Sequence, residues 1–291
     1  MCFVNTLFAK ALLTMSFGRY LRFQFRRRYL DNLKKLSHGI ADLESIAIAF
    51  SGGADSSFLA AVAKQISGID VVAVTIVSPF LSKTEIDQAA SMAEQLDLPH
   101  LVVPADLLAI PEIAQNSRDR CYFCKQKIFS LIKSSLKDSG VAHVVHGANS
   151  DDLDDFRPGF KAASEMGILA PLVDAGFRKE EIRRCSKEMG LPTWDLPSQS
   201  CLATRIPHDH RITAEKLTMV EKSEKILKDL GFKRVRVRCH EGMARLELDH
   251  GALETLGQEN VRNLVVKELK QIGFLHIALD LEGYVSGKMN R

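Results

Sequence analysis

The chain has 291 residues, of which 46% are hydrophobic and 26% charged, and its formal net charge is +3 at pH 7. This composition is typical of a soluble globular protein of one or two domains, and no apolar run is long enough to cross a bilayer, so we expect no membrane partner. The small charge gives no reason to expect a nucleic-acid partner, and six cysteines without a secretory signal indicate a reducing, cytoplasmic location.

Residues 1–30 form a basic N-terminal extension. They contain six basic residues and no acidic residue, and the charge follows the apolar stretch, which is the reverse of the order in a signal peptide. A transit peptide, a membrane-surface helix and a later start near Met15 or Tyr29 all fit this pattern. We therefore leave this segment out of the predicted fold.

Short apolar runs alternate with amphipathic stretches between residues 31 and 205. Ser82 and Glu85 have the spacing of a capping box and start a predicted helix that ends near Leu96. Strands separated by helices of this length form right-handed βαβ units, and solidly apolar strands indicate a sheet covered on both faces. Residues 31–205 are thus predicted to form an α/β domain around a parallel sheet with the strands Ile46–Phe50, Ile69–Val77, Leu101–Val103 and Ala142–Val145.

The pattern changes after residue 206. A predicted helix runs from Thr213, a suitable N-cap, to Gly231, which suits the position after a helix end. Two stretches near residues 234–249 then alternate charged and apolar residues, which predicts half-exposed strands with one polar, solvent-facing side. With a last helix (Val261–Ile272) and strand (Phe274–Leu279), residues 206–291 form a smaller α+β domain for substrate binding or oligomerisation.

The first strand leads directly into the sequence SGGADSS, residues 51–57, and a helix follows. The glycines let a ligand approach the main chain, and the helix N-terminus attracts an anion. Asp55 repels a bare phosphate and therefore indicates a bridging Mg²⁺ ion. A turn that merely joins a strand to a helix is the alternative, and the absence of Gly-Lys-Ser/Thr rules out a Walker A loop. The predicted nucleotide-binding residues are Ser51, Gly52, Gly53, Asp55, Ser56 and Ser57.

This loop resembles that of the PP-loop (adenine nucleotide α-hydrolase-like) superfamily. Its members have a HUP-like α/β domain and cleave ATP to AMP and pyrophosphate while they adenylate a substrate. The superfamily includes synthetases and tRNA-thiolating enzymes, so the loop predicts the chemistry and leaves the substrate open.

Three cysteines stand out downstream. Cys121 and Cys124 form a C-x-x-C at the start of a predicted helix, where the helix N-terminus favours thiolates. This motif fits a redox pair, half a zinc site, two ligands of an iron–sulfur cluster, or two incidental cysteines. Cys201 lies in a turn-rich segment that we expect to present its thiol, next to Arg205, which can stabilise a thiolate or bind phosphate. The remaining cysteines, which we interpret as structural, are Cys2, Cys185 and Cys239.

The sequences RCYFCK, HGANSDDLDDFRPG and PLVDAGFRKEEIRRCSKEMGLPTWDLPSQSCLATRIP resemble the LarE family over roughly residues 31–250. These are ATP-dependent sulfur transferases that build the nickel-pincer nucleotide cofactor of lactate racemase. The resemblance implies that ATP adenylates a carboxylate of a nicotinate-derived pyridinium-3,5-dicarboxylate mononucleotide, and that sulfur then displaces AMP to give a thiocarboxylate. Ala54 departs from the family, where valine is common.

The resemblance also implies roles for single residues. Members with one cysteine, at the position of Cys201, give up its sulfur and end with dehydroalanine, whereas three-cysteine members hold a 4Fe-4S cluster on the equivalents of Cys121, Cys124 and Cys201. Cys201, Asp55 and Arg205 are then catalytic. The expected substrate-binding residues are Arg157, Trp194, Glu224, Arg236, Arg238 and Glu247.

The resemblance also implies handover of the product to a nickel-insertion protein. The last helix and strand could serve as an interface, so we expect assembly into a homo-oligomer. The competing hypotheses are a tRNA-thiolating enzyme, for which residues 19–28 are the only basic candidate surface, and a non-catalytic nucleotide- or metal-binding protein. An acidic run, Asp151, Asp152, Asp154 and Asp155, follows the fourth predicted strand. Its ordinary interpretation is a solvated loop.

Overall fold

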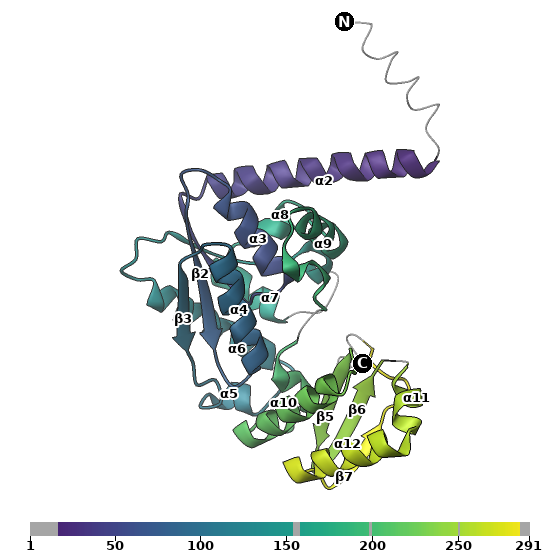
Figure 1. Ribbon diagram of the computed structural model, residues 1–291. Helices are drawn as coiled ribbons and strands as arrows, with labels where there is room; N and C mark the ends of the chain where they lie inside the picture. The colour runs from purple at the N-terminus through teal and green to yellow at the C-terminus, as the bar shows by residue number, and fades with distance from the viewer. Residues whose placement is uncertain (1–16, 154–157, 198–199, 250, 286–291) are drawn as a thin grey trace, which may run out of the picture.

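The computed structural model describes residues 17–153, 158–197, 200–249 and 251–285, with side chains from residue 28 onward (Figure 1). The first helix, α2 (Phe17–Ala41), reaches the body of the molecule with its C-terminal half. Leu36 and Ile40 of this half are buried in the first hydrophobic core. None of the described helices combines the length and the apolar character that a membrane span requires.

A four-stranded parallel sheet forms the first part of the molecule and confirms the predicted α/β class. Its strand order is β3-β2-β1-β4. The order of the strands reverses between β1 and β4, and ligands of such sheets bind outside the carboxyl ends of the strands at this point. The strands are β1 (Ser45–Ala49), β2 (Asp70–Val77), β3 (His100–Pro104) and β4 (His143–His146).

Helices cover both faces of this sheet, as the apolar strands predict. Ile46 and Ile48 point into a core with α3 (Ala54–Lys64), α4 (Lys83–Gln95) and α9 (Lys179–Glu188). Ala47, between them, faces the opposite core around α6 (Arg120–Ser135) and α7 (Pro158–Glu165). The predicted capping box is present, because the Ser82 side chain accepts a hydrogen bond from the Glu85 amide and the Glu85 carboxylate accepts one from the Ser82 amide. Two short helices, α5 (Pro111–Ala114) and α8 (Pro171–Asp174), complete this part.

A second, three-stranded sheet follows α10 (Ala214–Asp229). Its order is β5-β6-β7, with β5 antiparallel to β6 and β7 parallel to it. Thr213 caps α10 as predicted, and Gly231 follows the helix with a φ of 95°. The other elements of this part are β5 (Val235–His240), β6 (Met243–Leu248), α11 (Ala252–Gly257), α12 (Glu259–Ile272) and β7 (His276–Leu279).

The prediction that one side of β5 and β6 faces solvent is wrong. Glu247 on β6 is wholly buried and Arg238 on β5 is 9% exposed. The short 3-10 helix η3 (Leu202–Arg205) covers this side, and Arg238 donates a hydrogen bond to the Thr204 carbonyl within it. Arg238 and Glu247 therefore form a buried ion pair, whereas Arg234 on the same stretch is exposed.

The second hydrophobic core draws on residues from both sides of position 206. Phe80, Leu107 and Leu202 pack there with residues of α10, β5, β6 and α12. The backbone amide of Lys83 at the start of α4 also donates to Glu221 on α10 at 2.6 Å. The division at 205/206 stays a prediction, and these contacts join the two sheets across it.

Candidate functional site

The SGGADSS loop follows the carboxyl end of β1 and packs against α4. Gly52 has a φ of 67°, and a Cβ on it would lie 2.6 Å from the Cα atom of Ala89, so only glycine fits. Gln88 donates a hydrogen bond to the Gly52 carbonyl at 2.7 Å. Gly53 has an ordinary φ of −79°, so the predicted need for glycine conformational freedom holds at the first position only.

Backbone amides at the start of α3 are available to an anion. Gly53 is the N-cap and supplies no side-chain cap, so the first amides of the helix, from Ala54 on, lack an acceptor within it. The Ser51 and Ser56 hydroxyl oxygens are 3.1 Å apart, and the Gly53 amide donates to Ser51 at 3.3 Å. Ser57 differs, because it is wholly buried and its hydroxyl has no hydrogen-bond partner in the part of the chain that the structure describes.

Asp55 combines burial with an unpaired oxygen. Its Oδ2 accepts a hydrogen bond from Asn149 at 3.3 Å, while Oδ1 is buried and without a partner among the described residues. Burial raises the pKa of Asp55, nearby Lys179 lowers it and Asp152 raises it further. A buried carboxylate oxygen without a donor fits Mg²⁺, which takes one or two protein carboxylates together with substrate phosphates. The residues present therefore fit the ion that the sequence predicts.

The segment after β4 packs directly on the phosphate loop. A Cβ on Gly147 would lie 2.9 Å from the Ser56 amide nitrogen, so glycine permits this approach. In the following 3-10 helix η1 (Ser150–Leu153), Asp151 accepts hydrogen bonds from the Arg178 side chain at 2.9 Å and the Lys179 amide at 2.7 Å. Asp154, Asp155 and Arg157 lie outside the described residues.

Two cations near Asp55 were missed by the sequence analysis. Lys179 and Arg183 are one helical turn apart on α9, and both lower the pKa of Asp55 through their charge. Their four-residue spacing places them on one face of α9, but only the folded chain shows that this face lies near the loop. Trp194, in the 3-10 helix η2 (Pro192–Asp195), has the Lys187 ammonium 4.2 Å from its ring centroid. One face of the indole is therefore already occupied.

Cys121, Cys124 and Cys201 form a common site, although they come from distant parts of the chain. Cys121 and Cys124 lie in the first turn of α6, and Cys201 directly precedes η3. Burial raises the pKa of Cys124 to about 12, and the charges of nearby Cys201 and Cys121 contribute. Cys201 is partly buried against the second core, so the expectation of a fully presented thiol is wrong.

The three thiols come from two separate elements of the fold. Within the described ranges, no three His, Cys, Asp or Glu side chains are close enough together to bind one metal ion. Three cysteines are the number of protein ligands that the cluster implied by the resemblance requires. Of the other cysteines, Cys185 and Cys239 are buried as predicted, and Cys2 lies outside the described residues.

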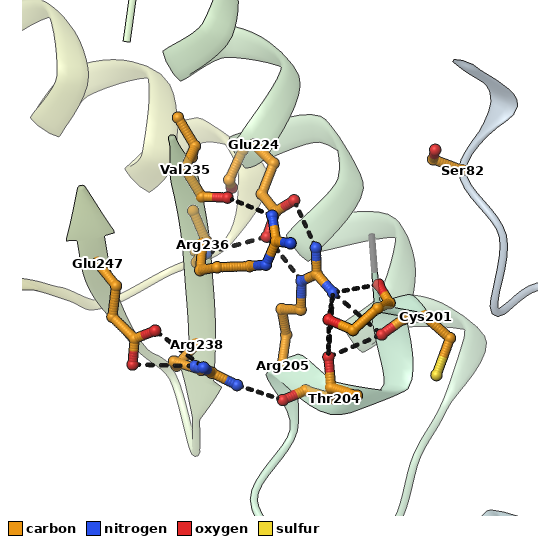
Figure 2. Close-up of polar contacts among 12 residues, drawn as sticks. Ser82, Cys201, Thr204, Arg205, Glu224, Val235, Arg236, Arg238 and Glu247 are labelled. Atoms are coloured by element: carbon orange, nitrogen blue, oxygen red, sulfur yellow. Dashed lines mark hydrogen bonds and ion pairs between the residues drawn. The ribbon is translucent and has the colours of Figure 1, made fainter. Parts of the chain in front are cut away.

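Arg205 holds the segment that carries Cys201 (Figure 2). Its Nε and Nη2 donate to Glu224 at 2.8 and 3.1 Å, and Nη1 donates to the carbonyls of Ser200 at 2.6 Å and Cys201 at 3.0 Å. Burial alone would lower the pKa of Arg205, but the Glu224 carboxylate raises it. The Cys201 sulfur points away from this guanidinium, so Arg205 contacts the backbone of the cysteine and not its thiol.

A second buried ion pair supports the same segment from β5 and β6. Arg238 binds Glu247 through two hydrogen bonds of 3.0 and 2.8 Å, and its Nη1 donates to the Thr204 carbonyl at 2.5 Å. Arg245 also donates to Glu247 at 3.0 Å. The predicted substrate-binding glutamates thus neutralise arginines inside the protein.

Arg236 has a different environment within this group. Its guanidinium carbon lies 5.2 Å from the ring centroid of Tyr284, and burial together with the nearby charge of Arg205 lowers its pKa. The residue is partly exposed. The structure therefore brings Glu224, Arg236, Arg238 and Glu247 together, as predicted, and leaves Arg236 the most exposed of the four.

The parallel sheet and its strand–SGGADSS–helix unit define the class of this protein, an ATP-using enzyme of the PP-loop superfamily. Residues 40–154, which include the loop, match the family described as asparagine synthase. The chain is 39% identical to an uncharacterized protein of Synechocystis sp. over 90% of this chain and 97% of that one.

A second relative identifies the family. The chain is 34% identical to the pyridinium-3,5-bisthiocarboxylic acid mononucleotide synthase of Lactiplantibacillus plantarum, over 86% of this chain and 91% of the relative. It is also 28% identical to an uncharacterized protein of Methanocaldococcus jannaschii, over 89% and 99%. The chain belongs to the LarE family, as the motifs predict, and is an ATP-dependent sulfur transferase.

Proposed function

We propose that this enzyme converts a carboxylate of a pyridinium-3,5-dicarboxylate mononucleotide into a thiocarboxylate. The observation that supports the proposal is that the phosphate loop and the segment leading to Cys121 both follow carboxyl ends of parallel strands, β1 and β3. In the proposal, a substrate activated at the loop receives sulfur at the cysteines. The substrate class is supported by the name of the Lactiplantibacillus plantarum relative, pyridinium-3,5-bisthiocarboxylic acid mononucleotide synthase.

The first step is adenylation. A carboxylate oxygen of the substrate attacks the α-phosphorus of ATP, the bond to the β-phosphate breaks, and pyrophosphate leaves. The amides at the start of α3 and the cations Lys179 and Arg183 stabilise the charge that develops on the leaving group. Asp55 would hold Mg²⁺, which when bound would neutralise charge on the phosphates, and the proposed ATP site is completed by Ser51, Gly52, Gly53, Ser56 and Ser57.

The second step is sulfur transfer. We assign Cys121, Cys124 and Cys201 as the residues that would hold a 4Fe-4S cluster. When bound, the cluster would supply sulfur taken up from inorganic sulfide, and this sulfur would bond to the carboxyl carbon as the bond from that carbon to the AMP oxygen breaks. The chain's own residues keep Cys201 in place through Arg205 and orient the adenylated carboxyl group toward the sulfur site. Displacement of AMP then gives the thiocarboxylate.

A sacrificial reaction of Cys201 is the alternative source of sulfur. Its Sγ would displace AMP to form a thioester, and loss of the Cα proton with cleavage of the Cβ–Sγ bond would leave the thiocarboxylate and dehydroalanine. The presence of the partly buried Cys121 and Cys124 favours the cluster, because a sacrificial reaction requires only one thiol.

The substrate phosphate is assigned to Arg236, a partly exposed arginine beside the buried ion pairs, with Arg157 and Trp194 as further contacts. The other assigned residues then act on the substrate indirectly, by supporting the segment that carries Cys201; they are Glu224, Arg238 and Glu247. In this proposal residues 31–205 bind ATP, and residues 206–291 contribute substrate contacts and an oligomer interface. Handover to a nickel-insertion protein follows product release, in the cytoplasm.

Anaerobic purification followed by absorption spectroscopy and iron and sulfide analysis tests the sulfur source. We expect iron and sulfide in the wild type and in Cys239→Ala, a matched control for a buried cysteine outside the site, and their loss in Cys121→Ala. ATP affinity with Mg²⁺ should be unchanged in all three. Absence of iron together with loss of the Cys201 sulfur after one turnover would replace the cluster with the sacrificial reaction.

Pyrophosphate release tests the adenylation step itself. We expect release to depend on the mononucleotide substrate and to be abolished in Asp55→Asn. Binding of tRNA that weakens steeply with salt would favour the tRNA-thiolating alternative, and ATP binding without any pyrophosphate release would favour a non-catalytic protein.

A further inference from the structure

We infer that Arg120 is the built-in counter-charge of the sulfur site, placed to stabilise negative charge on Cys121, Cys124 and Cys201 and on any sulfide bound there. The inference rests on the proposed function, because it concerns the cluster assigned to these cysteines. It adds a charged residue to a site described so far by its thiols alone.

Arg120 is the first residue of α6 and is only 3% exposed. Its Nη2 donates to the Cys121 sulfur at 3.4 Å. Nη1 donates to the Ala203 carbonyl at 3.2 Å and to the Asn116 side chain. The guanidinium therefore connects the C-x-x-C turn with η3, which follows Cys201.

The charge of Arg120 has no carboxylate partner in the described part of the chain. The ion pairs found there join Arg205 to Glu224 and Arg238 to Glu247, but none involves Arg120. A guanidinium remains protonated even when buried, and a buried charge without a counter-charge is strongly unfavourable. The two paired arginines show how this protein compensates buried guanidinium groups when the partner is a carboxylate.

Sulfur takes the place of the carboxylate at Arg120. The guanidinium contacts the Cys121 sulfur directly and reaches the segment that follows Cys201 through the Ala203 carbonyl. Cys124 lies one turn further along α6. An anionic sulfur centre is the partner that balances this buried charge.

Neutral groups fix the orientation of the guanidinium. Asn116 is wholly buried with a φ of 61°, and its amide donates to the carbonyls of Ile206 at 3.1 Å and Pro207 at 2.6 Å. This leaves its oxygen directed at Arg120. Since an amide and a carbonyl provide geometry without charge, the positive charge remains available to the sulfur site.

A positive charge beside an iron–sulfur cluster has two measurable consequences. It favours the reduced cluster, so it raises the reduction potential. It also favours retention of an additional sulfide, because that ligand makes the site more negative. Arg120 is thereby a tuning residue for the sulfur site and does not itself react.

Substitutions that separate charge from shape test the inference. We would reconstitute the full-length wild type, Arg120→Gln, Arg120→Lys and Arg118→Gln anaerobically, then measure iron content, reduction potential and the dissociation constant of inorganic sulfide. Arg118 is exposed and two residues away, so its variant makes the same charge change in solvent, where screening is strong. We expect Arg120→Gln to lower the potential and weaken sulfide binding about tenfold or more, which corresponds to about 1.4 kcal/mol.

Arg120→Lys should stay close to the wild type in both quantities, as should Arg118→Gln. If Arg120→Gln loses iron while Arg120→Lys keeps it with a potential near that of the wild type, the charge is required and the inference stands. An unchanged potential and sulfide affinity in Arg120→Gln would overturn it. So would loss of iron in both Arg120 variants with intact ATP binding, because the side-chain shape would then be what matters. If the wild type itself holds no iron, the assigned cluster and this inference fail together.

Discussion

At the scale of the residue, burial of polar groups next to the reaction site is the common theme. Among the described residues, one Asp55 carboxylate oxygen has no hydrogen-bond donor and the Arg120 guanidinium has no carboxylate partner. Each arrangement is unfavourable in the free chain, and a ligand of opposite charge, as proposed above, would compensate it. Such residues cost stability in the free protein and contribute to binding once the ligand is present.

His146 provides a pH test of a buried polar residue outside the reaction. It ends β4, its Nε2 is buried without a partner among the described residues, and its ring contacts those of Phe129 and Phe160. Burial lowers its pKa from 6.5 to about 4. The unfolded chain therefore takes up a proton that the folded chain does not, and stability is lost as the pH falls from about 6.5 to about 4.

The loss should reach about 3 kcal/mol at pH 4, at 1.36 kcal/mol per pKa unit. Replacement of His146 by Asn should flatten the urea-unfolding free energy between pH 6.5 and pH 5, where few carboxylates titrate. His143→Asn, on the same strand but partly exposed, is the control. An unchanged pH slope in His146→Asn would contradict this assignment.

At the scale of the element, the phosphate loop depends on its contact with α4. Gly52→Ala forces a left-handed φ on alanine and places Cβ against the Ala89 backbone. We expect a loss of about 1–3 kcal/mol in unfolding free energy and weaker binding of ATP, measured by calorimetry. Gly53→Ala is the matched control, because its φ is ordinary and its new Cβ would meet only the Ser51 hydroxyl at 3.3 Å. Equal effects of the two substitutions would contradict the role of α4.

The Arg205–Glu224 pair determines how firmly η3 is attached to α10. Glu224→Gln leaves a buried guanidinium without its counter-charge, so we expect a loss of about 3 kcal/mol or more in urea unfolding. Lys225→Gln breaks a neighbouring pair with Asp229 on the same helix, in which both side chains are exposed, and should change stability by less than about 0.5 kcal/mol. A small loss in Glu224→Gln would mean that other contacts hold the Cys201 segment.

At the scale of the whole molecule, the second core contains residues that leave the first sheet, such as Phe80 and Leu107. We expect the two sheets to unfold together. Leu269→Ala on α12, wholly buried in that core, should cost about 2–5 kcal/mol. The fluorescence of Trp194, the single tryptophan of the chain, should shift to lower denaturant together with the far-UV circular dichroism. An unmoved fluorescence transition would show that the two parts unfold independently.

Local sequence patterns were sufficient to predict the class of fold, the four parallel strands, the helix caps at Ser82 and Thr213, and the position of the phosphate loop. These features depend on neighbours within a few residues. Lys179 was missed because Asp55 is distant in the sequence. Arg120 was missed because nothing in the local sequence distinguishes a buried cation from a solvated one. The prediction of a solvent-facing side on β5 and β6 was wrong for a related reason. An alternation of arginine and glutamate has the same period whether water or η3 covers that side.

The distribution of the three cysteines along the chain also restricts when their site can mature. Cys121 and Cys124 precede β4, whereas Cys201 follows α9, so during synthesis the site stays incomplete until the last of them has left the ribosome and η3 has docked on α6. Iron or sulfur that requires all three thiols must therefore be delivered to a chain that has already folded. Its assembly is a late step of biogenesis, and a nascent chain that stalls before residue 201 exposes a reactive pair of thiols.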